Sequence, residues 1–413
     1  MSIDFTFSDE QKALRQNARM FAETVLGQVK ATIAPFAKPE DRFYATRPFY
    51  QKMVDAGFLK ALLPVAYGGT AMPTLDFALA AEELARIDVN VPSALLATGL
   101  GVIPIARFGT EEQKQRFLPD FAGSDAKLAA LAFTEVTGGA NFDCPDPRFG
   151  VQTFAIRDGD DYVINGEKHY TTNGSGWDGT TCDLYTVTCR TDPTKGPEES
   201  LAMIVVPGST PGIEVVGFLD TLGHRATVSP RIRFNNVRVP VSNLLGKPGD
   251  GKRILGQTFA WTAALIGAAC TGVMRAAFET AYQFARTDSR SGPAPIIGYQ
   301  NVGFMLADLK MRIEASRYLT WKACHRLDES DYEDLELAVM AKVYCSELSV
   351  QVVYDAMRLV GVDSYTQLHP LAELMQDALC FPLYDGGNMG ARRRQLHEMF
   401  LSDDYDPLGA CGA

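Results

Sequence analysis

Closely spaced cysteines are missing from this sequence of 413 residues, although it contains eight cysteines. None of them forms a C-x-x-C pair, so the sequence indicates neither a zinc site nor a disulfide framework. The simple interpretation is a set of reduced thiols in a cytoplasmic protein. The five histidines show no paired spacing either, and we therefore predict no metal site.

A long hydrophobic run and an excess of positive charge are also absent. The most apolar stretch, residues 259–274, is short for a membrane span and rich in Ala, Gly and Thr, which favours a helix buried among helices. The formal net charge of −11 argues against nucleic acid or an anionic membrane surface as the partner. Residues 1–5 show no basic segment followed by an apolar one, so we expect no signal peptide.

Three zones of different character follow one another along the chain. Residues 1–125 predict an N-terminal helical domain that starts with a capping box at Ser8–Gln11. Residues 75–87 predict a further helix. The glycines and prolines within residues 91–105 are expected to break the next apolar run.

The middle zone, residues 126–242, predicts a β-domain. Turns are expected at Asp158–Gly159 and at Asn165–Gly166, because both dipeptides favour tight hairpin turns. Short strands at turn-punctuated intervals predict an antiparallel barrel or sandwich. The expected strands cover residues 151–156, 161–164, 184–189, 201–206 and 231–239.

The last zone, residues 243–413, predicts a helical bundle. Long helices of similar length are typical of antiparallel bundles. The expected helices cover residues 254–286, 300–325, 333–360 and 392–401. The predicted fold class is therefore α+β, mostly helical, in the order helical, β, helical.

A candidate general base lies near the end of the chain. Asp385 precedes two glycines, and Arg392 follows seven residues later. The glycines would let a flat ligand approach the backbone, and the arginine would keep the carboxylate ionised and oriented. Taken alone, Asp-Gly-Gly is more often a plain turn.

Three other segments could bind a cofactor. Thr134, with the glycine-rich bend behind it, could present a hydroxyl and backbone N–H groups to the edge of a ring. Tyr170 could stack on a planar group while Thr172 donates to a ring nitrogen. Arg290, ten residues before Gln300, is a natural partner for a pyrophosphate. Each segment alone also has an ordinary structural explanation as a loop, a strand or a solvated charge.

Taken together and in this order, the segments resemble the flavoproteins of the acyl-CoA dehydrogenase fold over essentially the whole chain. This resemblance implies an N-terminal helical domain, a middle antiparallel β-barrel domain, a C-terminal four-helix bundle and a homotetramer. FAD would lie between the β-domain and the bundle and be completed by a neighbouring subunit, with Thr172 near flavin N5. The residues implied in FAD binding are Leu131, Phe133, Thr134, Gly139, Ala140, Tyr170, Thr172, Arg290, Tyr299, Gln300, Arg358, Gly361, Tyr384, Gly386, Gly387 and Asn388.

Three departures from the family pattern concern the substrate. Asp385 stands where the family usually has Glu, and Ala140 removes a serine hydroxyl available to the pantetheine arm of CoA. Trp261 and Thr262 replace a substrate-side Arg-Pro pair. An apolar Trp261 in the substrate pocket, where a cation would serve a thioester, indicates a small uncharged substrate.

The subfamily that looks most similar is nitroalkane oxidase, on the Asp-Gly-Gly-Asn segment, the basic start at Arg392 and the hydroxyl residue at 262. The resemblance implies that Asp385 removes the α-proton of a neutral nitroalkane, that Arg392 orients the base and that Thr262 bonds to it. The implied products are an aldehyde or ketone, nitrite and H2O2, with O2 as the electron acceptor. Acyl-CoA dehydrogenase, a flavin monooxygenase of the same fold and a non-catalytic flavin carrier stay open as alternatives.

Overall fold

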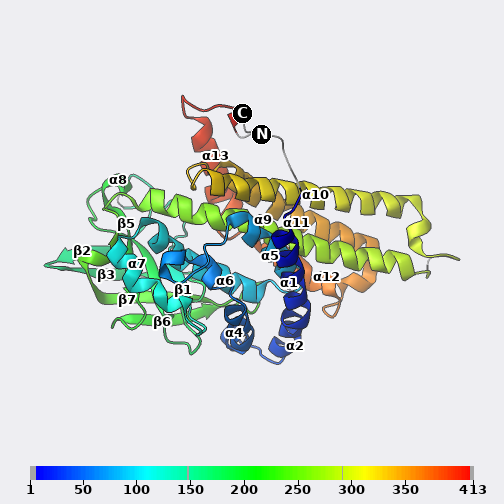
Figure 1. The fold of residues 1–413 in the computed structure, drawn as a ribbon, viewed down its shortest axis with the longest axis horizontal. Coiled ribbons are helices and arrows are strands. Elements are labelled where there is room, and N and C mark those ends of the chain that lie inside the picture. The colour runs from blue at the N-terminus through cyan, green and yellow to red at the C-terminus, as the bar shows by residue number, and fades with distance from the viewer. Residues whose placement is uncertain (1–5, 147, 291, 410–413) are drawn as a thin grey trace.

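The computed structural model describes residues 6–146, 148–290 and 292–409. It consists of a β-sheet at one end, a long helical bundle that extends away from it, and N-terminal helices packed along the junction (Figure 1). Residues 1–5, on which the signal-peptide expectation rests, and Cys411 lie outside the described residues. The seven described cysteines are all free.

The N-terminal helices begin as the sequence predicts. The Ser8 hydroxyl accepts a bond from the Gln11 backbone N–H at 3.2 Å, and the Gln11 side chain accepts one from the Ser8 N–H at 3.1 Å, which confirms the capping box. The predicted second helix is also present. The helices of this part are α1 (Asp9–Thr24), α2 (Val29–Ile33), α3 (Pro39–Ala45), α4 (Arg47–Asp55), α5 (Thr74–Ala85), α6 (Asn90–Phe108) and α7 (Glu111–Phe117).

The expected break within residues 91–105 is wrong, because α6 runs through this stretch without interruption. Pro92 lies in the first turn, where its missing N–H is not needed. The glycines serve packing: a Cβ on Gly101 would lie 2.6 Å from that of Ala129 in the sheet. Burial of the helix therefore outweighs the local cost of glycine and of Pro104 inside the helix.

The middle zone forms an eight-stranded sheet in the order β6-β7-β3-β2-β4-β5-β8, with β1 paired to β4. Most pairs are antiparallel, but β1 runs parallel to β4, so the sheet is mixed rather than wholly antiparallel. The strands are β1 (Ala129–Ala132), β2 (Phe154–Asp158), β3 (Asp161–Lys168), β4 (Leu184–Arg190), β5 (Leu201–Pro207), β6 (Ile213–Leu219), β7 (Ser229–Pro240) and β8 (Leu244–Leu245), and a short helix, α8 (Pro197–Ser200), precedes β5.

One of the two predicted turns in the sheet is present. The Asp158–Gly159 turn joins β2 to β3 as expected. The turn predicted at Asn165–Gly166 is wrong: β3 continues there through a shift in its register with β7. A Cβ at Gly166 would lie 2.4 Å from the Thr153 hydroxyl, so this glycine is needed for a close contact and not for a chain reversal.

The bundle consists of α9 (Gly251–Thr287), α10 (Gln300–Glu329), α11 (Glu336–Val360) and α12 (Pro370–Cys380), followed by α13 (Arg393–Phe400). At 37 residues, α9 is about 55 Å long and carries the bundle from the sheet to its far end. Its small residues permit close contacts: a Cβ on Gly267 would lie 2.5 Å from the Thr320 hydroxyl of α10. The sequence did not predict α12.

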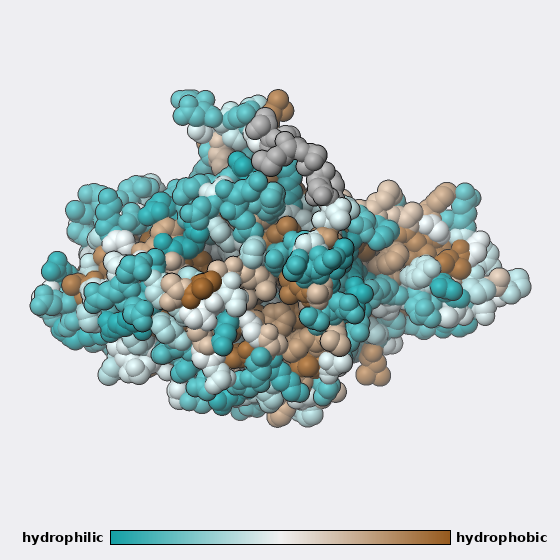
Figure 2. Space-filling view, viewed as in Figure 1, coloured by the Kyte–Doolittle hydropathy of each residue, from teal (hydrophilic) through white to brown (hydrophobic). Residues whose placement is uncertain are grey.

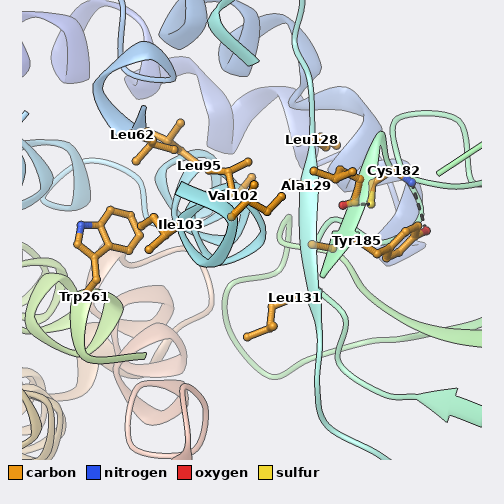
Figure 3. Packing of buried hydrophobic residues seen from close by; sticks show 14 of the residues in the cluster. Leu62, Leu95, Val102, Ile103, Leu128, Ala129, Leu131, Cys182, Tyr185 and Trp261 are labelled. Atoms are coloured by element: carbon orange, nitrogen blue, oxygen red, sulfur yellow. Dashed lines mark hydrogen bonds between the residues drawn. The ribbon is translucent and has the colours of Figure 1, made fainter. Parts of the chain in front are cut away.

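Two described helices, Asn90–Phe108 and Gly251–Thr287, are long and apolar enough to cross a membrane by length and composition. In the fold, 67% and 89% of their apolar windows are buried, as expected for helices of a protein core. Figure 3 shows α6 residues such as Val102 and Ile103 packed between the sheet residues Ala129 and Leu131 and the indole of Trp261 on α9. This core joins the three parts of the chain and places α9 beside the β-domain.

Candidate active site

The loop that carries Asp385 joins α12 to a π-helical segment, η8 (Gly387–Arg392). Asp385, Gly386 and Gly387 have φ values of 53°, 91° and 63°, so three successive residues adopt the left-handed conformation. A Cβ on Gly386 would lie 3.0 Å from Nε of Arg392. The glycine therefore lets the arginine fold back onto the loop, and the strained turn points the Asp385 side chain inward.

Three hydrogen bonds hold Asp385. Nη2 of Arg392 lies 2.7 Å from Oδ2, and Nε donates to the Asp385 backbone carbonyl at 2.8 Å. The hydroxyl of Thr262, on α9, donates to Oδ1 at 2.6 Å. The side chains of Arg392 and Asp385 are only 2% and 3% exposed. The three predicted catalytic residues therefore lie together, and the carboxylate is a paired charge held in one orientation.

Arg392 also connects the base to the β-domain side of the site. Its guanidinium lies 5.4 Å from the ring of Phe259 and donates to the Phe259 carbonyl at 3.3 Å. The Phe259 ring in turn lies 5.4 Å from that of Phe133, which follows β1. A continuous chain of contacts thus runs from the base to the segment predicted to bind the flavin.

The two segments predicted to bind the flavin ring lie side by side. The His169 N–H donates to the Thr134 carbonyl at 2.7 Å, so Thr134 lies next to the end of β3. Within the described residues, neither the Thr134 nor the Thr172 hydroxyl has a hydrogen-bond partner. Tyr170 is 57% exposed and has a φ of 53°, which turns its ring away from the core. Two available hydroxyls beside an exposed aromatic ring fit a flat ligand with polar edges.

A buried ion pair supports these segments from behind. Nζ of Lys168 lies 2.8 Å from Glu135 and donates to the Phe133 carbonyl at 3.0 Å. Burial lowers the pKa of Lys168, although Glu135 opposes this. Burial alone would raise the pKa of Glu135, but Lys168 and the Thr153 hydroxyl outweigh it, and the pKa lies below its usual value. The pair therefore fixes the loop that begins at Thr134.

The same loop is tied to the helix that follows the base. Asp143 forms ion pairs with Lys252 on α9 at 3.0 Å and with Arg394 on α13 at 2.8 Å. A Cβ on Gly390 would lie 2.8 Å from that of Ala140, so the two segments touch. Ala140, predicted near the flavin, thus lies against the base segment, whereas Gly139 packs against the Phe133 ring of its own loop. Asp143 was not predicted from the sequence.

Lys342 on α11 is a second residue of the site that was not predicted from the sequence. Its ammonium is fully buried and donates to the Phe381 carbonyl and to Oδ1 of Asn388, both at 2.8 Å. Burial lowers its pKa to about 8. The available signal was a single lysine within the apolar run of residues 337–343.

Asn388, predicted to bind the cofactor, has another role for its side chain. Besides accepting from Lys342, it donates to the Ser346 hydroxyl at 2.9 Å and to Glu347 at 3.0 Å. The side chain is buried, and its polar atoms are bonded to protein groups. Tyr384 is likewise packed between His224 and Phe381, with ring centroids 5.3 Å and 5.9 Å away. These side chains shape the loop from within.

Trp261 lies beside the base but points elsewhere. Its ring meets that of Phe77 edge to face at 5.7 Å, and a Cβ on Gly99 would lie 2.5 Å from it. Trp261 therefore fills the space between α9 and α6 (Figure 3). Beyond Phe77 a small apolar cavity opens between α5, α6 and α9, with Ala81, Leu95 and Ala269 among its lining residues.

A second group of predicted residues lies at the far end of the bundle. Arg290 pairs there with Asp288 at 2.5 Å and with Asp363 at 2.7 Å, next to the end of α11. From Thr262 to the end of α9 at Thr287 is about 38 Å along the helix. Within one chain, this group therefore lies far from Asp385. Its members are Arg290, Tyr299, Gln300, Arg358 and Gly361.

Within the described ranges, no group of three or more His, Cys, Asp or Glu side chains is arranged to hold a metal ion. The polar groups at the base are instead a carboxylate, a guanidinium and a hydroxyl. This set is suited to proton transfer to and from an oriented acid.

Thr262→Ala tests the hydroxyl at the base. Hydrogen bonds to charged groups contribute about 1.5–3 kcal/mol. We therefore expect kcat/KM for the predicted nitroalkane substrate to fall about 10- to 100-fold. Thr262→Ser keeps the hydroxyl and should retain most activity. Steady-state kinetics on the two FAD-loaded variants measure this, and equal losses in both would contradict the role of the hydroxyl.

Comparison with known proteins shows the family of the chain. The acyl-CoA dehydrogenase N-terminal, middle and C-terminal domain models match residues 8–125, 130–237 and 249–399. A nitroalkane oxidase from Fusarium oxysporum is 36% identical over 99% of this chain and 97% of its own length. The solved Podospora anserina nitroalkane oxidase superimposes with a TM-score of 0.95 at 36% identity over 100% of both chains.

More distant relatives act on CoA thioesters by name. A cyclohex-1-ene-1-carbonyl-CoA dehydrogenase from Geobacter metallireducens is 34% identical over 92% of this chain and 97% of its own. The family consists of FAD-dependent oxidoreductases, and the groups near Thr134, Tyr170 and Thr172 fit that cofactor. The chain therefore belongs to the acyl-CoA dehydrogenase superfamily of flavoproteins, in its nitroalkane oxidase branch.

Proposed function

We propose that the protein oxidises neutral nitroalkanes with O2 and water to an aldehyde or ketone, nitrite and H2O2, and that Asp385 removes the α-proton. The observation that carries this proposal is the buried carboxylate of Asp385, held at both oxygens by Arg392 and Thr262. A general base of this kind is suited to a substrate whose C–H bond is made acidic by a nitro group.

Each residue of the cluster has a distinct task. Asp385 accepts the α-proton, and the product of this step is the nitronate anion. Arg392 compensates the negative charge before the transfer, and its bond to the Asp385 backbone keeps the loop in place. Thr262 fixes the rotation of the carboxylate. When bound, FAD supplies the two-electron oxidation and the reaction with O2.

Thr134, Thr172 and Tyr170 are the groups that would hold the flavin ring on the other side of the substrate. The Glu135–Lys168 pair keeps their segments in register, and Asp143 ties them to the helix after the base. The distance between base and cofactor thus depends on contacts within one chain.

The solved relatives and the uncharged neighbour of Thr262 support a small neutral substrate. Trp261 precedes Thr262 in the sequence and fills the α9–α6 interface, so it places no charge beside the base. The solved nitroalkane oxidases that resemble this chain, with a TM-score of 0.94, include crystals grown with 1-nitrooctane and with 1-nitrohexane. We extend that substrate class to this chain.

We further propose a homotetramer in the cytoplasm. Phe304, Met311 and Tyr318 repeat every seven residues on α10 and are 62%, 61% and 47% exposed, and Figure 2 shows apolar colour gathered over the far part of the bundle. A neighbouring subunit packed there would bring the group around Arg290 to a second flavin. Seven free cysteines suit a reducing compartment.

The test is nitrite release from nitroethane in air by the purified, FAD-loaded protein, with H2O2 measured in parallel. We expect nitrite and peroxide in equal amounts. A yellow, folded protein that forms no nitrite would contradict the proposal, and activity on an acyl-CoA thioester or on an amine would then identify the dehydrogenase or monooxygenase alternative.

A further inference from the structure

The loop from Phe381 to Asn388 is closed at both ends by one side chain, that of Lys342. The ammonium donates to the carbonyl of Phe381, where the loop begins, and to the side chain of Asn388, where it ends. The Asn388 N–H also donates to the Pro382 carbonyl at 2.8 Å. Asp385 lies in the middle of this loop, so the position of the base depends on contacts at the two ends.

Both partners of Lys342 are uncharged. In the described part of the chain, no carboxylate lies within ion-pair distance of its ammonium. A buried cation without a carboxylate partner is costly, since burial disfavours the charged form. Such a group persists where its charge or its bonds serve the site around it.

Four other titratable groups influence the pKa of Lys342. Asp385 and Glu347 favour its protonated form, and Arg392 opposes it. The Cys270 thiol on α9 completes this set, and burial raises its pKa, so it is neutral at pH 7.

We infer that Lys342 is a positioning residue for the base: its buried ammonium holds the two ends of the loop that carries Asp385. The inference rests on the proposed role of Asp385. Arg392 then orients the carboxylate from the substrate side of the loop, and Lys342 supports the same loop from α11 without touching the substrate.

The test uses Lys342→Met and Lys342→Gln in the FAD-loaded, full-length protein. Methionine removes both the charge and the donors, whereas glutamine keeps a donor near the loop. For Lys342→Met we expect kcat/KM for nitroethane to fall about tenfold or more, because the loop that carries the base loses its contacts at both ends and the base is no longer held in place. Oxidation of preformed ethyl nitronate, which needs no base, should change less than about threefold.

A second measurement does not depend on activity. Hydrogen–deuterium exchange of the peptide containing residues 381–390 should be faster in Lys342→Met than in the parent protein, and close to the parent in Lys342→Gln. Ser349→Ala, a buried substitution seven residues further along α11, is the matched control and should leave both the activity on nitroethane and the exchange unchanged.

An unchanged kcat/KM for nitroethane in a folded Lys342→Met would overturn the inference, and so would equal losses on nitroethane and nitronate, which mark a merely structural residue. If Lys342→Met does not fold, Lys342→Gln decides: it keeps only one end contact, so it should still lose more activity on nitroethane than on nitronate. If the parent protein releases no nitrite, the proposed function fails. Independently of that result, unchanged exchange of the loop in a folded Lys342→Met would refute the inference that Lys342 holds the two ends of the loop.

Discussion

Asp385→Asn is expected to abolish the oxidation of neutral nitroethane and to spare the oxidation of ethyl nitronate. Removal of a general base typically lowers a rate about 100- to 10,000-fold, and we expect kcat/KM for nitroethane to fall within this range. The nitronate has already lost its proton, so its oxidation bypasses the base. Asparagine keeps the shape and an acceptor for Thr262, which limits the change to the missing carboxylate.

The matched control is Asp377→Asn, eight residues earlier. Burial raises the pKa of Asp377 to about 8, so at pH 7 this carboxyl carries a proton and asparagine imitates its neutral form. We expect activity close to that of the parent protein. Asp385→Glu keeps the chemistry but lengthens the reach, and should retain partial activity.

Parallel assays of nitrite from nitroethane and of peroxide from nitronate measure these expectations. The decisive ratio is nitronate to nitroethane activity, which should rise by at least about two orders of magnitude in Asp385→Asn. If a folded, flavin-loaded Asp385→Asn protein loses both activities, Asp385 serves flavin binding or reactivity and not proton transfer.

The fold was predictable where local signals and packing agree. The capping box at Ser8 and the long α9 helix carry signals within a few residues, and both are confirmed. The turn at Asn165–Gly166 and the break in α6 carry equally strong local signals, and both are wrong. At these positions a glycine is required by close contact with a segment distant in the sequence, which a local pattern does not contain.

The candidate site divides in the same way. Asp385 and Arg392 are seven residues apart, and their pairing follows from a tight glycine turn. Thr262 is 123 residues away from Asp385, so only the resemblance to a family brought it to the base. Lys342 and Asp143 act through partners on other elements, and their residue types alone do not distinguish them from ordinary helix and loop residues.

Arg392→Met is expected to cause the largest loss of stability among the substitutions at the site. It leaves Asp385, whose side chain is 3% exposed, as a buried charge with only Thr262 beside it. Removing one partner of a buried ion pair typically costs about 3–5 kcal/mol of unfolding free energy. Activity on nitroethane should fall as well, because the carboxylate loses its orientation.

Arg393→Met is the natural control, since it removes the next arginine in the chain. Arg393 is 44% exposed and pairs with Glu347 at 3.2 Å on the surface, where an ion pair contributes about 0–1 kcal/mol. Urea unfolding of both FAD-loaded variants measures the difference. An Arg392→Met protein as stable as Arg393→Met would mean that water or another cation compensates Asp385.

The double variant Arg392→Met/Asp385→Asn separates the cost of an unpaired charge from the value of the pair. Both charges are then absent, so most of the stability lost in Arg392→Met should return, while activity on nitroethane stays low. Additive losses of stability would show that Arg392 stabilises the loop through the Asp385 backbone and Phe259 carbonyls, and that the carboxylate contributes little. Recovery of stability without activity would instead show that the ion pair is kept for its chemistry.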